Sequence, residues 1–156
     1  MNTTRVPSLY PGEECLVPPK GGHSACPGCA IPLLLRYFLK ATGGGVVMVV
    51  PPGCTLAIIM FPSFSLMNPF YQGRPITVLS TAFGSTAVCS SGLKAALEAR
   101  GDTERDVVAW GGDGATHDIG LQALSAAAER NDNIIYVCCD NEGYQNTDNQ
   151  RSSATT

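Results

Sequence analysis

The stretch from Asp106 to Asp140, "DVVAWGGDGATHDIGLQALSAAAERNDNIIYVCCD", decides the fold of this chain. It opens with an apolar run over 106–110 and continues through the glycine-rich "GGDG" into 118–131, where apolar residues recur at helical spacing. A second apolar run follows over 133–140. A strand, a tight turn, a helix and a second strand in this order predict parallel pairing through a right-handed crossover.

The same alternation continues upstream. Residues 30–45, "AIPLLLRYFLKATGGG", predict a helix that ends in glycines, and "VVMVV" at 46–50 predicts a strand buried on both faces. A second strand is expected at 75–80 and a helix rich in small residues at 84–102. The apolar segment 56–72 contains prolines and is expected to be irregular or short helical. The chain is therefore predicted to be an α/β protein with a parallel sheet flanked by helices.

Length and composition are typical of one domain that has partner subunits. The 156 residues fit a single domain, which we assign to 23–156, after an extended arm over 1–22 that is rich in Pro, Gly and Glu. Hydrophobic residues make up 44% of the chain and charged residues only 15%. A soluble monomer usually carries more surface charge, so we expect partner subunits to cover part of this surface.

Several classes of function and location are disfavoured by the sequence. The formal charge of -3 provides no basic face for nucleic acid. No apolar run approaches the ~20 residues that a membrane-spanning helix needs, and the first 22 residues lack the apolar core of a signal peptide, so a cytoplasmic protein is expected. Seven cysteines in a reducing compartment indicate metal, cluster or core roles rather than disulfides.

Polar side chains follow the two strands that flank the crossover. Asp113 comes directly after the first, and Asn141 follows the second. The carboxyl ends of parallel strands share one edge of a sheet, so these side chains are expected to be neighbours. Carboxylate and amide oxygens suit Mg²⁺, while Gly112 and Gly114 would let the backbone approach a phosphate. A clamp for a magnesium-bound diphosphate is the functional interpretation, and a chance glycine-rich turn is the alternative.

Residues 112–155, "GDGATHDIGLQALSAAAERNDNIIYVCCDNEGYQNTDNQRSSAT", resemble the thiamine diphosphate-binding β subunit of pyruvate:ferredoxin oxidoreductase and related 2-oxoacid:ferredoxin oxidoreductases. The resemblance runs from about His23 to the end of the chain and is patchy between 55 and 80. It implies the thiamine diphosphate-binding fold, in an incomplete form. It also implies that Asp113, Asn141 and the Gly143 carbonyl hold Mg²⁺, and that Asn146 faces the thiazolium and the substrate as a catalytic residue.

Three cysteines form a second group of candidate functional residues. "HSACPGCA" places Cys26 and Cys29 in a C-x-x-C, and "PPGCT" adds Cys54 at a strand end. The spacing alone is compatible with a zinc half-site, a redox dithiol or a cluster. The resemblance implies that the three are ligands of a 4Fe-4S cluster, whose fourth cysteine lies further along in the family. We expect the chain to be the front part of a longer subunit; a ligand from another chain, or Cys15, is the alternative.

Structural roles are expected for several other reactive side chains. Cys138 and Cys139, within an apolar strand, and Cys89, among small helix residues, are interpreted as core packing. His117 and Asp118 are expected to cap and orient the helix after the glycine-rich turn. His23 is interpreted equally as a residue that orders the cysteine loop or as an ordinary surface residue.

The resemblance implies oxidative decarboxylation of a 2-oxoacid, with pyruvate as the default acid. Coenzyme A would take the acyl group, ferredoxin the electrons, and α-, γ- and δ-type subunits would complete the enzyme, one of them with the activating glutamate. Asp148, Pro52 and the segment 81–92 depart from the usual family sequence and leave the acid open. The alternatives are a non-oxidative thiamine diphosphate-dependent decarboxylase or synthase fragment, and an inactive cofactor-binding remnant.

Overall fold

The computed structural model describes residues 24–60, 70–71 and 74–156. The predicted arm, the alternative ligand Cys15 and His23 lie outside these residues. The elements, in chain order, are α1 (Ile31–Thr42), β1 (Val46–Val50), α2 (Cys54–Met60), β2 (Phe70–Tyr71), β3 (Arg74–Ser80), α3 (Thr86–Ala99), β4 (Asp106–Gly112), a π-helical turn (Gly114–Asp118), α4 (Leu121–Glu129), β5 (Ile135–Cys139) and a 3-10 turn (Gln145–Thr147).

The strands form one sheet in the order β2-β3-β1-β4-β5. β3, β1, β4 and β5 are parallel to one another: Val46 of β1 pairs with Ile76 of β3 and with Asp106 of β4, and Val108 of β4 pairs with Ile135 of β5. The predicted parallel sheet is confirmed. The short β2 adds an antiparallel edge that lies within the segment expected to be irregular.

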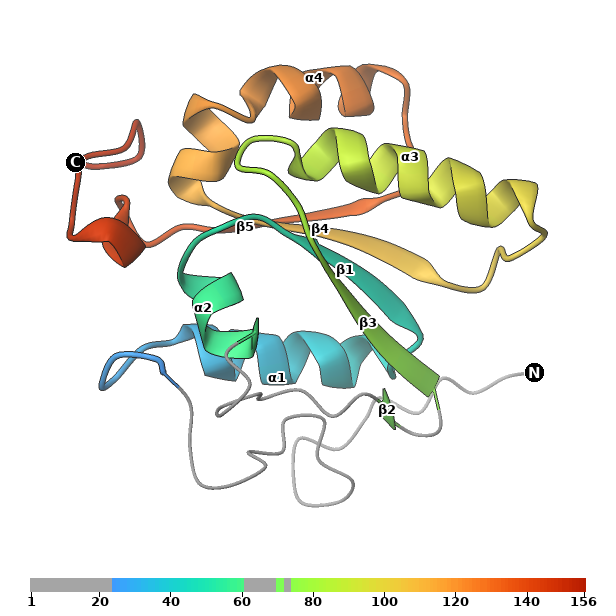
Figure 1. Ribbon diagram of the computed structural model, residues 1–156, viewed down its shortest axis with the longest axis horizontal. Coiled ribbons are helices and arrows are strands. Elements are labelled where there is room, and N and C mark those ends of the chain that lie inside the picture. Colours follow the sequence, from blue (N-terminus) through green and yellow to red (C-terminus); the bar gives the residue numbers. More distant parts are fainter. Residues whose placement is uncertain (1–23, 61–69, 72–73) are drawn as a thin grey trace.

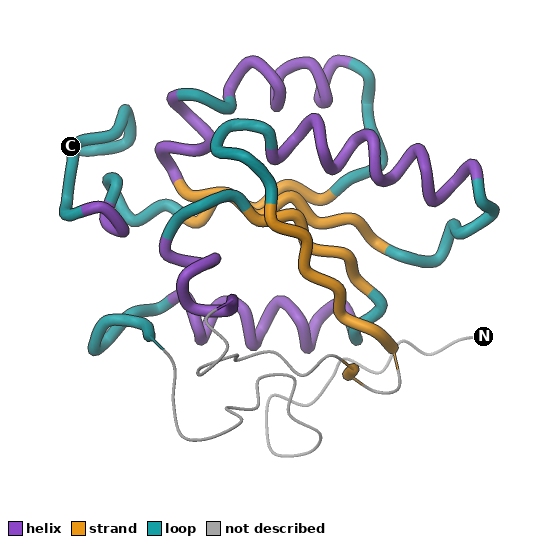
Figure 2. The backbone as a smooth tube through the Cα atoms, viewed as in Figure 1, coloured by secondary structure: helices purple, strands orange, loops and turns teal. Residues whose placement is uncertain are grey.

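Helices cover both faces of the sheet. α1 and α2 lie on one face, and α3 and α4 lie on the other (Figures 1 and 2). Alternate residues of β1 pack on opposite faces of the sheet. Met48 belongs to the hydrophobic cluster that contains Leu35 of α1, and Val49 belongs to the cluster that contains Leu97 of α3. Every residue of β1 is buried, as predicted for an apolar run without alternation.

Trp110, near the carboxyl end of β4, contacts both α1 and α2. Its indole N–H donates to the Thr55 hydroxyl of α2 at 3.1 Å, and its ring meets Phe38 of α1 edge-on, with centroids 5.4 Å apart. A buried indole usually needs such a partner for its N–H. The carboxyl-terminal edge of the sheet is therefore held against both helices of this layer.

The connection after β4 is more elaborate than the simple turn expected. Between β4 and α4, the Ile119 N–H donates to the Gly114 carbonyl at 3.4 Å, a bond that spans five residues. α4 begins only at Leu121, without a side-chain cap. The expectation that Asp118 caps this helix is wrong, because its carboxylate accepts hydrogen bonds from Tyr144 and from Ser153 near the carboxyl terminus. π-Helical turns of this kind are frequent at functional sites.

β5 forms one edge of the sheet, and its residues are half-exposed or exposed. No helix among the described residues is long and apolar enough to cross a membrane.

Candidate functional site

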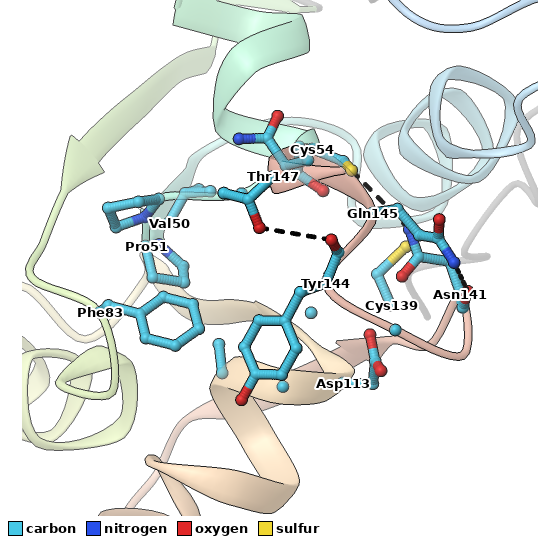
Figure 3. Close-up of a pocket in the computed structure, with 18 of the residues that line it drawn as sticks. Val50, Pro51, Cys54, Phe83, Asp113, Cys139, Asn141, Tyr144, Gln145 and Thr147 are labelled. Carbon is cyan, nitrogen blue, oxygen red and sulfur yellow. Dashed lines mark hydrogen bonds between the residues drawn. The ribbon is translucent and has the colours of Figure 1, made fainter. Parts of the chain in front are cut away.

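A pocket of about 310 Å³ lies at the carboxyl ends of β1 and β4. The chain leaves β1 towards β3 and leaves β4 towards β5, in opposite directions across the sheet. Ligands of α/β proteins bind at such switch points, and this volume is within the roughly 300–1,000 Å³ of small-molecule sites. Figure 3 shows Pro51 and Phe83 on one side of the pocket and Asp113, Asn141 and Cys139 on the other.

Asp113 is the buried acid of this pocket. It directly follows β4, is 1% exposed, and accepts a hydrogen bond from the Ser152 hydroxyl. None of the ion pairs among the described residues includes it. The β4 backbone and the carboxyl-terminal loop therefore fix an acidic group that lacks a basic partner within this part of the chain.

Asn141 meets Asp113 as the sequence predicts. One end of its side-chain amide lies 3.0 Å from Asp113 Oδ1 and 3.0 Å from the Gly143 carbonyl oxygen. With its nitrogen at this end, the amide donates to both oxygens. With its oxygen there, carboxylate, amide and carbonyl oxygens converge, and this is the donor set that Mg²⁺ prefers. The three residues expected to hold magnesium thus come together and fit the ion.

The loop after β5 is held by its own hydrogen bonds. The Gly143 carbonyl accepts from the Gln145 N–H at 2.9 Å, and the Tyr144 N–H donates to the Gln150 carbonyl at 2.8 Å. Asp148 has a φ of 89°, a conformation that favours glycine. Aspartate is among the residues that tolerate this conformation.

Asn146 and the two glycines of the "GDG" sequence differ in how they border the pocket. Asn146, in the 3-10 turn, is exposed and lines the pocket. A Cβ on Gly112 would have only the Cys139 carbonyl oxygen nearby, at 4.0 Å, so this backbone leaves open space. A Cβ on Gly114 would lie 2.5 Å from the Tyr144 ring. Gly112 therefore fits the predicted clearance for a phosphate, while Gly114 makes room for Tyr144.

Sequence reasoning did not find Tyr144 or the residues that hold it. The Tyr144 hydroxyl donates to Asp118 Oδ2 at 2.6 Å, and its ring lies 6.1 Å from that of Phe83, centroid to centroid. The hydrogen bond to Asp118 raises the pKa of Tyr144 to about 12. Hydrogen bonds from Ser153, and then from Tyr144, lower the pKa of Asp118. A polar aromatic residue directly after the predicted ligand Gly143 was the available signal.

The C-x-x-C forms a tight turn. The Cys29 N–H donates to the Cys26 carbonyl at 3.0 Å, and Gly28 has a φ of 78°. Proline followed by glycine at the centre of such a turn is typical of type II. Cys54 is the first residue of α2 and lines the pocket. When the amide oxygen of Asn141 faces Asp113, its Nδ2 donates to the Cys54 sulfur at 3.7 Å.

The three predicted cluster cysteines influence one another. Burial raises the pKa of the Cys54 thiol, the hydrogen bond from Asn141 opposes this, and Cys29 and Cys26 raise it further. Their thiols offer the donor chemistry of an iron-sulfur cluster. No three His, Cys, Asp or Glu side chains within the described ranges are arranged to hold a single metal ion.

The cysteines expected in the core are half-buried. Cys139 packs against the core cluster of α1 and lines the pocket, and burial, followed by the effects of Cys29, Cys138 and Cys54, raises its pKa to about 11. Cys89 packs against the cluster beneath α3, in agreement with its predicted role. Cys138 instead lies 3.7 Å from His117 Nε2.

Residues 64–156 match the family described as thiamine pyrophosphate enzyme, C-terminal TPP binding domain. Thiamine pyrophosphate is another name for thiamine diphosphate. The match covers more than half of the chain, so the chain belongs to this family of thiamine pyrophosphate enzymes.

Individual relatives indicate which enzymes of this family the chain is similar to. The chain is 43% identical over 146 residues to the pyruvate synthase subunit PorB of Methanothermobacter thermautotrophicus, a match that covers 93% of this chain and 47% of the relative. It is 43% identical over 139 residues to the ketoisovalerate oxidoreductase subunit VorB of Pyrococcus abyssi, covering 86% of this chain and 42% of the relative. The chain thus spans about half the length of these relatives, and the resemblance stated from the sequence is confirmed.

A solved structure supports the fold. The 2-oxoglutarate:ferredoxin oxidoreductase of Magnetococcus marinus aligns with a TM-score of 0.59 at 23% identity, over 86% of this chain and 43% of that chain.

Proposed function

We propose that this chain is the thiamine diphosphate- and iron-sulfur-binding part of a 2-oxoacid:ferredoxin oxidoreductase subunit. The convergence of Asp113, Asn141 and the Gly143 carbonyl at a switch-point pocket carries the proposal. Relatives named for pyruvate and ketoisovalerate support the 2-oxoacid class. Pyruvate is the acid proposed here, since the pyruvate synthase subunits are among the relatives that match most of this chain.

The charges of the pocket support a metal-bridged diphosphate. The described residues that line the pocket include Asp113 but no Lys, Arg or His. A diphosphate beside a buried carboxylate needs a compensating cation, and Mg²⁺ is commonly held by one or two carboxylates together with substrate phosphates. Asp113, Asn141 and Gly143 would hold this ion, and the open backbone at Gly112 would admit the phosphate.

Bound thiamine diphosphate supplies a nucleophilic carbon and an electron sink for decarboxylation. The chain's own contribution is to position and shield it. Pro51, Phe83 and Trp110 provide an apolar wall of the pocket. The Tyr144 to Asp118 hydrogen bond holds the loop on which Asn146 sits. Asn146 is proposed to face the reacting end of the cofactor and the substrate.

The electron path from the pocket would pass through a cluster held by cysteines. Cys26, Cys29 and Cys54 are proposed to hold a 4Fe-4S cluster, and Cys54 also lines the cofactor pocket. The short separation that this implies suits transfer of electrons from the pocket to the cluster and then to ferredoxin. Coenzyme A would take the acyl group, and α-, γ- and δ-type partner subunits would supply the remaining parts in a cytoplasmic complex, with no role for nucleic acid or membrane.

The test uses the subunit assembled with its partners. We expect the brown colour of an iron-sulfur protein and pyruvate-dependent reduction of a viologen dye in the presence of coenzyme A. Cys54→Ser should abolish dye reduction, whereas Cys89→Ser, a matched change within α3, should not. A non-oxidative enzyme would keep its turnover after replacement of all three cysteines, and an inactive remnant would bind Mg²⁺ and thiamine diphosphate without any electron transfer. Either result would contradict the proposal.

A further inference from the structure

The side chain of Asn141 lies between the proposed metal site and the proposed cluster. One end of its amide is 3.0 Å from Asp113 Oδ1 and from the Gly143 carbonyl oxygen, and the other end is 3.7 Å from Cys54 Sγ. We propose that this amide couples occupancy of the metal site to the reduction potential of the cluster that Cys54 holds. The inference rests on the proposed function for both sites.

The coupling follows from the shape of the amide. Oxygen and nitrogen occupy opposite ends of one rigid group, and only the nitrogen can donate a hydrogen bond. When the oxygen faces Asp113, the nitrogen faces Cys54 and donates to the sulfur. When the group is turned over, the nitrogen donates to Asp113 and Gly143, and the oxygen faces the sulfur. The Asn141 side chain can therefore take either of two orientations, and in each its N–H group reaches only one of the two sites.

A cation selects between these orientations. Without a metal ion, the turned-over amide gains two hydrogen bonds of 3.0 Å to the oxygens of Asp113 and Gly143. Mg²⁺ requires oxygen ligands, so binding of Mg²⁺ in this place requires the amide oxygen to face it. The amide nitrogen must then point at Cys54. Metal binding thus favours one of the two orientations of the Asn141 amide. A group with two discrete states that both sites influence is the physical basis of coupling between those sites.

The sulfur of a cluster ligand responds to this change. A cluster carries more negative charge when it is reduced, and hydrogen bonds to its sulfurs are among the factors that set its potential. An N–H that points at Cys54 therefore favours the reduced cluster. By linkage, reduction must tighten metal binding by the same factor. We expect a factor of about ten, which corresponds to 59 mV for a one-electron couple.

Asn141→Asp is the test variant, since aspartate keeps an oxygen for the metal but has no N–H for the sulfur. Its added charge needs a control, and Gln145→Glu provides one. The Gln145 Nε2 donates to the Asn141 backbone carbonyl at 3.2 Å. The Glu variant therefore adds a negative charge beside Asn141 and leaves its side-chain amide in place.

The measurements are made on the full subunit assembled with its partners, with cluster content checked by iron and sulfide analysis. Potentiometric titrations followed by electron paramagnetic resonance are run with and without Mg²⁺ and thiamine diphosphate, at concentrations that saturate each variant. Electron-nuclear double resonance of the reduced cluster in D₂O detects an exchangeable hydrogen at the ligand sulfur. The metal's own charge acts on the potential in all variants, so only the hydrogen signal and the difference between variants report the amide.

Binding of the metal and cofactor should raise the potential of wild-type protein by about 59 mV more than that of Asn141→Asp, and should strengthen the deuteron coupling in wild-type protein. Asn141→Asp should lose this coupling, while Gln145→Glu keeps the coupling and the wild-type shift in potential. A wild-type deuteron coupling that does not depend on Mg²⁺, or a coupling that persists in Asn141→Asp, overturns the inference. Wild-type protein without a cluster, or without pyruvate-dependent dye reduction, would instead contradict the proposed function.

Discussion

Replacing Asp113 with asparagine should raise the stability of the fold in the absence of metal and should remove its capacity to hold a metal ion. The side chain is 1% exposed, and no ion pair among the described residues includes it. A buried charge without a partner costs several kcal/mol, which hydrogen bonds such as that from Ser152 offset only in part. The neutral amide has the same shape, so the variant should be more stable than wild-type protein by about 1–2 kcal/mol in the absence of metal.

When Mg²⁺ and thiamine diphosphate are present, wild-type protein should instead be more stable than Asp113→Asn. At concentrations of Mg²⁺ and thiamine diphosphate a hundredfold above the dissociation constant, wild-type protein gains about 2.7 kcal/mol. For a chain of this size that gain corresponds to a rise in melting temperature of roughly 5–11 °C. Asp113→Asn should gain none, because it lacks the carboxylate that the ion requires. Thermal unfolding with and without the ligands measures both effects.

Asp148→Asn is the matched control, since it removes an exposed carboxylate from the same side of the molecule and asparagine tolerates the same positive φ. It should keep the full ligand-dependent rise in melting temperature. The reasoning is refuted if Asp113→Asn is less stable than wild-type protein without ligands, or if the ligands stabilise it to the same extent.

Three further substitutions, one of them with a control substitution, test the site and its surroundings. Gly112→Ala places a methyl group in open space, so calorimetry should find binding of thiamine diphosphate at least tenfold weaker while stability changes by less than about 1 kcal/mol; equal binding would exclude a phosphate at this backbone. Gly120→Ala would bring a Cβ within 2.0 Å of a backbone carbonyl and should cost about 3 kcal/mol or more in urea unfolding, whereas Gly92→Ala, which meets nothing within 4 Å inside α3, should stabilise by about 0.5–1 kcal/mol. Tyr144→Phe should remove the phenol that ionises near pH 12 in an absorbance titration at about 295 nm. Because the pKa of Tyr144 is raised, the stability from its hydrogen bond to Asp118 is present at neutral pH and is lost as pH rises from about 10 through 12; the same loss at high pH in the Phe variant would contradict this. The lowered pKa of Asp118 adds a loss of stability as pH falls below about 4, and this loss should remain in the Phe variant because Ser153 also bonds to Asp118.

The main layers of the fold could be predicted from local patterns. The run at 46–50 has no polar residue, and it forms the central strand buried on both faces. Asp113 and Asn141 follow adjacent parallel strands, so their proximity required only the pairing rule. These predictions needed information from short stretches of sequence and one general property of parallel sheets.

The parts that could not be predicted depend on distant contacts. Asp118 stands where helix-capping residues are common, but its partners Tyr144 and Ser153 come from the loop after β5. The π-helical turn interrupts a segment whose apolar spacing resembles one continuous helix. Ser152, which holds Asp113, lies 39 residues away in sequence, and no local pattern indicates that pairing.

The intrinsic fluorescence of Trp110 can be used to follow ligand binding in this pocket. Trp110 is the sole tryptophan of the chain, and it lines the pocket while donating its N–H to Thr55. Its fluorescence should therefore sense the arrival of an aromatic cofactor directly, without a label. Titrations of ligand affinity can thus be followed by emission in variants that have lost all turnover.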